Sequence, residues 1–137
     1  MIRTRILLLV VVLAMMTSIA SAQSKIDDLV DRYSTSTTSK YTSAVERNPK
    51  TREVVKVVKI LEMNYCNVAT FVNAFKNDDS NSDLSESRSN NDLVMTRTMR
   101  GKKQNRIYML KADGYYNKYG LTKARSHCMV TVIIKYK

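Results

Sequence analysis

The chain has few of the residues that most catalytic and cofactor sites need. Its 137 residues include three glycines, one proline, two cysteines and one histidine. Glycines at positions 101, 114 and 120 are too sparse for a phosphate-binding loop, which needs several within one turn. Two cysteines and one histidine at no regular spacing make a poor zinc site. The composition therefore predicts no cofactor and no metal.

The reactive residues are also poorly placed for catalysis. The single histidine, His127, precedes Cys128 in a β-branched run, and neighbouring strand residues point to opposite faces of a sheet. A cysteine nucleophile and its histidine must face each other. A glycosidase needs two acids across a cleft, but most acids lie near residues 27–31 and in 78–92, where solvation explains them. We therefore expect no enzyme, and a small hydrolase is the weakest alternative.

The first residues have the pattern of a secretory signal peptide. A basic start is followed by an apolar run over residues 6–16 and by Ala20-Ser21-Ala22, an A-x-A cleavage pattern. The run is short for a membrane anchor, which needs roughly 20 apolar residues. We expect residues 1–22 to be cleaved, leaving 23–137 as one exported domain, periplasmic or extracellular, with no transmembrane segment.

Positive charge is concentrated in the C-terminal third. The formal net charge is +11, yet residues 23–92 hold 10 basic and 11 acidic residues. Residues 93–137 hold 11 basic residues and one acid, Asp113. Such a region can bind anionic partners, whereas the plain alternative is a solvated surface that keeps the protein soluble. Export disfavours nucleic acid as the partner.

Tyrosines interleave with this charge and give the region the character of a binding surface. Tyrosine is an amphipathic contact residue, and cations stack on its ring. The alternative is that some of these tyrosines are half-buried core residues. The predicted binding residues are Arg100, Lys102, Lys103, Arg106, Tyr108, Lys111, Tyr115, Tyr116, Lys118 and Tyr119.

Apolar periodicity predicts two helices. Ile26, Leu29, Val30 and Tyr33 form one stripe over residues 24–33, and Ser24 is a suitable N-cap. Residues 67–76 carry a second stripe that contains both phenylalanines, which we interpret as core packing.

The remaining pattern is that of strands. We expect them at residues 41–46, 93–99, 106–112 and 127–137. Val54–Leu61 also fits a helical stripe, but its β-branched content favours a strand paired with 41–46. Asp113-Gly114 indicates a hairpin. Residues 77–92 are polar and acidic and predict a mobile loop, without the glycine and closing glutamate of a calcium loop.

The final run, 127–137, is the strand around which the fold is expected to form. One of its faces carries Cys128, Val130, Val132, Ile134 and Tyr136, and a fully apolar face needs a layer above it. Cys66 and Cys128 could form a disulfide in an oxidising compartment, or remain two buried thiols.

Three segments carry a resemblance to a known group of proteins: Asp28–Ser34, Thr42–Thr51 and Val54–Lys59. With the leader, they resemble small secreted proteins of unknown function from Bacteroidetes. The resemblance covers most of residues 23–137 and implies a bacterial envelope location and a small α+β fold. It brings no catalytic residues.

The prediction is an α+β domain with two amphipathic helices packed on one face of a four- to six-stranded antiparallel sheet. The first functional hypothesis is a non-catalytic binding or interaction module for an acidic glycan or an envelope protein. The alternative is an inhibitor or accessory subunit of an envelope protein. The pattern does not indicate an oligomeric state.

Overall fold

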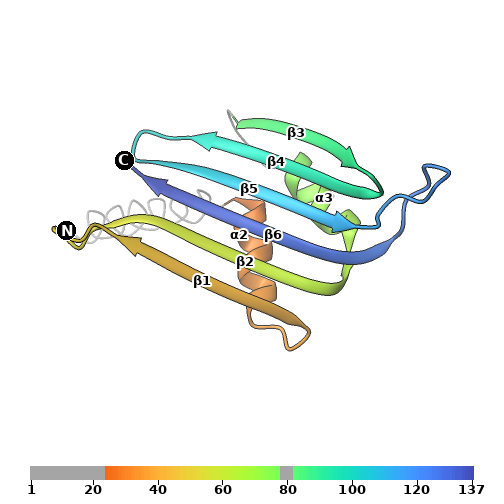
Figure 1. Cartoon of the computed structure of the whole chain (residues 1–137), viewed down its shortest axis with the longest axis horizontal. Helices are drawn as coiled ribbons and strands as arrows, with labels where there is room; N and C mark the ends of the chain where they lie inside the picture. The colour runs from red at the N-terminus through yellow and green to blue at the C-terminus, as the bar shows by residue number, and fades with distance from the viewer. Residues whose placement is uncertain (1–23, 78–81) are drawn as a thin grey trace, which may run out of the picture.

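The computed structural model describes residues 24–77 and 82–137. These residues form two helices and six strands, and the strands make one antiparallel sheet in the order β1-β2-β6-β5-β4-β3 (Figure 1). The α+β class and the antiparallel sheet are as predicted, whereas the expected signal peptide lies outside the described residues. The elements are α2 (Lys25–Ser34), β1 (Ser39–Arg47), β2 (Val54–Asn67), α3 (Val68–Lys76), β3 (Ser82–Ser89), β4 (Asp92–Arg100), β5 (Gln104–Asp113) and β6 (Arg125–Tyr136).

The last strand lies inside the sheet. β6 pairs with β2 on one side and with β5 on the other, so that Val130 lies between Leu61 and Leu110. The alternate residues of β6 from Cys128 to Ile134 are buried, as predicted for its apolar face. Tyr136, at the end of that face, is 42% exposed.

Helix α2 begins where the sequence predicts. The Ser24 side chain accepts a hydrogen bond from the Asp27 backbone N–H at 3.0 Å, which satisfies one of the free donors of the first turn. Ile26, Leu29 and Val30 are buried as the apolar stripe requires. Asp27 is buried with them, which the stripe does not predict.

Helix α3 also coincides with its predicted stripe, and its buried residues include Phe71 and Phe75. Its N-cap, Asn67, makes no side-chain capping bond. At the other end, buried Arg97 of β4 donates to the carbonyl oxygens of Phe75 at 2.8 Å and Lys76 at 3.4 Å. A cation at a helix C-terminus can donate hydrogen bonds to the free carbonyls, and it interacts favourably with the negative end of the helix dipole.

Both helices lie behind the sheet in the view of Figure 1. The rings of Tyr33 in α2 and Phe71 in α3 are 5.6 Å apart, so the two helices meet. Their buried side chains belong to the same core cluster as Leu61, Leu110 and Val130 of the sheet.

A disulfide joins Cys66 to Cys128, with the Cα atoms 6.0 Å apart. Cys66 lies near the end of β2, where the pairing with β6 becomes irregular between Met63 and Cys66. The bond therefore ties the start of α3 to the middle of the sheet. Val54–Leu61 is a strand, as favoured from its composition, and the strand continues to Asn67.

The expected mobile loop over residues 77–92 is wrong for much of its length. Ser82–Ser89 forms β3, which pairs with β4 along the edge of the sheet, and Asp92 begins β4. An edge strand can be polar on both faces, because its backbone pairing does not require an apolar side chain. Of the acids that invite comparison with a calcium loop, Asp78 and Asp79 lie outside the described residues. Asp83 and Glu86 occupy β3 positions of opposite parity, so their side chains point to opposite faces of the sheet.

The predicted hairpin at Asp113-Gly114 is also wrong in its length. β5 ends at Asp113, but β6 begins only at Arg125, and residues 114–124 form a projecting loop (Figure 1). Gly114 has φ of 61°, as a turn glycine does. The chain then makes its tight turn later, where the Asn117 side chain accepts from the backbone N–H groups of Tyr119 and Leu121.

Candidate binding surface

The predicted binding residues do not form one surface. Arg100, Lys102 and Lys103 lie at the β4–β5 turn, where β5 begins, and Tyr115 to Tyr119 lie in the loop after β5 ends. A strand of this length spans about 30 Å at roughly 3.3 Å per residue. The basic turn and the tyrosine loop are therefore at opposite ends of the sheet, as Figure 1 shows.

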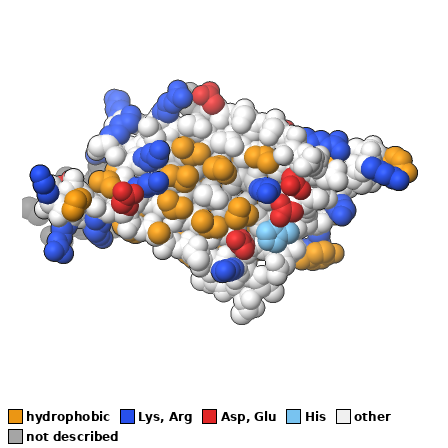
Figure 2. All heavy atoms as spheres, viewed as in Figure 1, with side chains coloured by type: hydrophobic (Ala, Val, Ile, Leu, Met, Phe, Trp, Pro, Cys, Tyr) orange, Lys and Arg blue, Asp and Glu red, His pale blue; other side chains and the backbone are white. Residues whose placement is uncertain are grey.

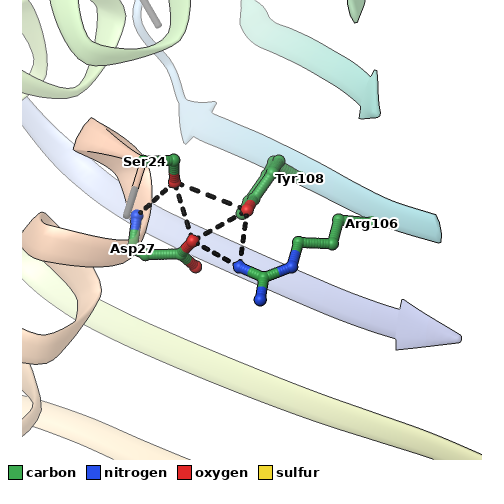
Figure 3. Close-up of polar contacts among 4 residues, drawn as sticks. All are labelled: Ser24, Asp27, Arg106 and Tyr108. Atoms are coloured by element: carbon green, nitrogen blue, oxygen red, sulfur yellow. Dashed lines mark hydrogen bonds and ion pairs between the residues drawn. The ribbon is translucent and has the colours of Figure 1, made fainter. Parts of the chain in front are cut away.

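Arg106 and Tyr108 lie elsewhere again, on the side of the sheet that faces the helices. Tyr108 is 0% exposed, so the prediction that it binds a partner is wrong. Its hydroxyl donates to Oδ2 of Asp27 at 2.9 Å, and Nη1 of Arg106 donates to the same oxygen at 2.7 Å (Figure 3). The Ser24 hydroxyl donates to this oxygen at 2.8 Å. These four residues, which we call the Asp27 cluster, join the start of α2 to β5.

The electrostatics of the Asp27 cluster favour the protonated forms of Tyr108 and Arg106. Burial raises the pKa of Tyr108, although its hydrogen bonds with Arg106 and Ser24 act in the opposite direction. Burial works against the charged form of Arg106, but the hydrogen bond with Tyr108 and the charge of Asp27 leave the pKa of Arg106 raised. The cluster is thus a partly buried ion pair, supported by two hydroxyls, that links α2 to β5.

The tyrosine loop is partly attached to the core. Tyr115 and Tyr116 pack against the core cluster, and their rings are 4.9 Å apart. The guanidinium of Arg88 lies 4.6 Å from the centre of the Tyr116 ring. Tyr119 is 75% exposed, with Nζ of Lys118 5.0 Å from its ring centre. The alternative drawn from the sequence, that some of these tyrosines are half-buried core residues, therefore holds for Tyr115 and Tyr116 but not for Tyr119.

The other end of the sheet collects basic side chains from three separate segments. The β1–β2 turn, the β4–β5 turn and the C-terminus meet there, because Lys56 pairs with Lys135 and Gln104 pairs with Tyr136. We call this region the basic end. Its basic residues are Arg47, Lys50, Arg52, Lys56, Arg100, Lys102, Lys103, Lys135 and Lys137.

Negative charge is sparse in the basic end. In residues 46–56, 100–105 and 135–137, all of which are described, the acids are Glu46 and Glu53. The backbone N–H of Lys137 donates to the carbonyl of Lys103 at 3.0 Å, which fixes the C-terminus beside the β4–β5 turn. Figure 2 shows the blue side chains of this region gathered around the left end of the molecule. The contribution of the β1–β2 turn was not predicted, because residues 23–92 taken together have a net charge of only −1.

The face of the sheet away from the helices carries an apolar centre. Figure 2 views this face and shows hydrophobic side chains across the middle of it. Two paired rows supply them: Val58 beside Ile133 and Ile107, and Ile60 beside Thr131 and Met109. Their side chains are partly exposed, and Met109 is 39% exposed. Neither of the described helices covers this face.

His127 and Cys128 point to opposite faces, as expected. Cys128 is in the disulfide, and Nδ1 of His127 lies 2.8 Å from Oδ2 of Asp113. Nζ of Lys111, another predicted binding residue, lies 3.7 Å from Oδ1 of Asp113. The histidine–carboxylate pair follows from the register of β5 and β6, which the sequence alone does not give. Within residues 24–77 and 82–137, no group of three or more potential ligands is placed to hold a metal ion.

No protein family model, curated protein or solved structure matches the chain. The resemblance to secreted Bacteroidetes proteins therefore stays a prediction. In the part of the chain that the structure describes, no helix has the length and apolar character needed to cross a membrane.

Proposed function

We propose that the chain is an exported, non-catalytic binding module that holds an acidic glycan at its basic end. The observation that carries this proposal is the convergence of three chain segments at one end of the sheet, with nine basic side chains and two acidic ones. A carboxylated polysaccharide matches such a surface, since it offers a row of negative charges at a regular spacing. The tyrosine loop takes no part in this contact.

The rigidity of the basic end supports this assignment. Gly101 donates its backbone N–H to the Gln104 carbonyl at 2.9 Å, and a Cβ at this position would lie 2.7 Å from that oxygen. The β4–β5 turn is therefore tight, and it sets the backbone positions of Lys102 and Lys103. On the neighbouring hairpin, the Asn48 side chain accepts from the N–H groups of Lys50 and Thr51.

The test measures binding of the mature protein to immobilised polygalacturonate, with neutral dextran as the reference surface. The double variant Lys102→Glu/Lys103→Glu is expected to lose at least about tenfold in affinity. This loss corresponds to about 1.4 kcal/mol of binding free energy, which two modest charge contacts can supply. Raising the salt concentration is expected to weaken binding of the unchanged protein steeply, because exposed charges are screened.

The matched control is Lys118→Glu/Lys123→Glu, which changes the net charge equally at the far end of the sheet. The Debye length is about 8 Å at physiological salt, so charges some 30 Å away contribute little. An equal loss in both double variants would show attraction by net charge alone and would refute a site at the basic end. Equal retention on dextran and polygalacturonate would refute the acidic-glycan proposal.

A further inference from the structure

A cavity of about 770 Å³ lies at the opposite end of the molecule from the basic end. Its volume is within the range of about 300–1,000 Å³ that is typical of small-molecule sites. The end of α2, the 37–39 segment, the end of β2 and the first turn of α3 form its walls. Cys66 is one of the lining residues, so the disulfide fixes the wall that β2 contributes.

Two tyrosines with exposed surface, Tyr33 and Tyr65, line this cavity, whereas Phe71 is 1% exposed and packs against Tyr33. Tyr33 and Phe71 meet at 40° between ring planes and are part of the lining. Tyr65 is also a lining residue and is 73% exposed, so its ring is available to a ligand at the mouth. An aromatic ring face of this kind can pack against a cluster of C–H groups on one side of an otherwise polar molecule.

The polar groups that line the cavity are uncharged with one exception. Hydroxyl and amide side chains offer both donors and acceptors at Thr37, Thr70, Asn64 and Asn67. Arg125 is the exception, with its guanidinium 5.3 Å from the Tyr65 ring centre. No carboxylate is among the described lining residues. A ligand with many hydroxyls and one negative charge fits this set.

One lining side chain lacks a partner. The hydroxyl oxygen of Ser39 is buried and has no hydrogen-bond partner among the described residues. A buried polar atom without a partner destabilises the free protein. Rotation of the Ser39 side chain toward a hydroxyl of a bound molecule would remove this cost.

We propose that this cavity binds one sugar residue that carries a single anionic group, a hexuronate or a similar acidic monosaccharide unit. Tyr33 and Tyr65 take the ring face, the amides and hydroxyls take the sugar hydroxyls, and Arg125 pairs with the carboxylate. This site is separate from the basic end, and its test does not depend on the polysaccharide experiment.

The test titrates the mature protein with D-glucuronic acid, D-glucose and acetate and follows backbone amide signals by NMR. Glucuronic acid is expected to shift the signals of Ser39 and of residues 64–67 in a saturable way. Glucose should bind more weakly at the same residues, and acetate should leave them unchanged. The Arg125→Gln variant is expected to lose about tenfold in affinity for glucuronic acid while keeping its affinity for glucose.

Lys123→Gln is the matched control, because it removes the same charge two residues away and does not line the cavity. It should bind glucuronic acid like the unchanged protein. Three results would each overturn the proposal: no saturable shifts at millimolar sugar, equal affinity for glucose and glucuronic acid, or equal losses from Arg125→Gln and Lys123→Gln. Retained glucose binding by Arg125→Gln guards against misreading a folding defect.

Discussion

Replacing Asp27 with asparagine is expected to cost far more stability than the same replacement one residue later. Asp27 and Asp28 both lie in the first turn of α2, where a negative charge interacts favourably with the helix dipole. Asp28 is exposed, whereas Asp27 is 8% exposed and accepts three side-chain hydrogen bonds on one oxygen. The difference between the two variants therefore isolates the contribution of the Asp27 cluster.

The magnitude follows from what asparagine keeps and what it removes. Its carbonyl can still accept hydrogen bonds, but neutral bonds are roughly half as strong as those to a charged acceptor. Breaking a buried ion pair costs about 3–5 kcal/mol. The Arg106 side chain is 29% exposed, so water can partly solvate the charge that remains. We expect a loss of about 3 kcal/mol for Asp27→Asn and about 0.5 kcal/mol for Asp28→Asn.

Urea unfolding followed by circular dichroism measures both variants, with tyrosine fluorescence as a second probe because the chain has no tryptophan. The slope m should not change, so the loss should appear as a lower midpoint. A double-mutant cycle with Arg106→Gln should give a coupling free energy above about 1 kcal/mol. Equal costs for Asp27→Asn and Asp28→Asn, or a coupling free energy near zero, would refute the reasoning.

Two further predictions concern the disulfide and the buried tyrosine. Changing Cys66 and Cys128 together to alanine should lower the free energy of unfolding by about 4 kcal/mol, because the bond closes a loop with a sequence separation of 62; a loss under about 1 kcal/mol in urea unfolding would contradict this. Tyr108→Phe should destabilise the protein at neutral pH through the lost hydrogen bond to Asp27. Burial raises the pKa of Tyr108 above 10.0, so the folded protein keeps a proton that the unfolded chain loses. The stability that Tyr108 contributes is present in full below pH 10 and is lost as the pH rises through the raised pKa. The difference in stability between Tyr108→Phe and the unchanged protein should therefore shrink above pH 10, and a difference that does not depend on pH would contradict the assignment.

Periodicity predicted the elements whose burial is one-sided. The stripes of both helices and the alternation from Cys128 to Ile134 are patterns that one buried face imposes on a sequence. β3 lacks such a pattern, since Leu84, its only large apolar residue, is itself 39% exposed. Pairing to the backbone of β4 holds it in place, and backbone pairing leaves no trace in side-chain type.

The Asp27 cluster and the basic end were harder to predict, because both depend on which residues of neighbouring elements lie beside each other. Arg106 and Tyr108 have the composition of a surface contact, and only the position of Asp27 in another element explains their burial. The basic end needs the β1–β2 turn to meet the β4–β5 turn and the C-terminus, and these segments are far apart in the sequence.

The place of β6 in the sheet makes it the link between two groups of strands. β1 pairs with β2, and β3, β4 and β5 pair in succession, but only β6 connects the two groups. Without β6, the sheet would be two separate ladders, and the inner edges of β2 and β5 would be unpaired. A 12-residue strand that pairs along both of these edges is therefore what makes the six strands one sheet.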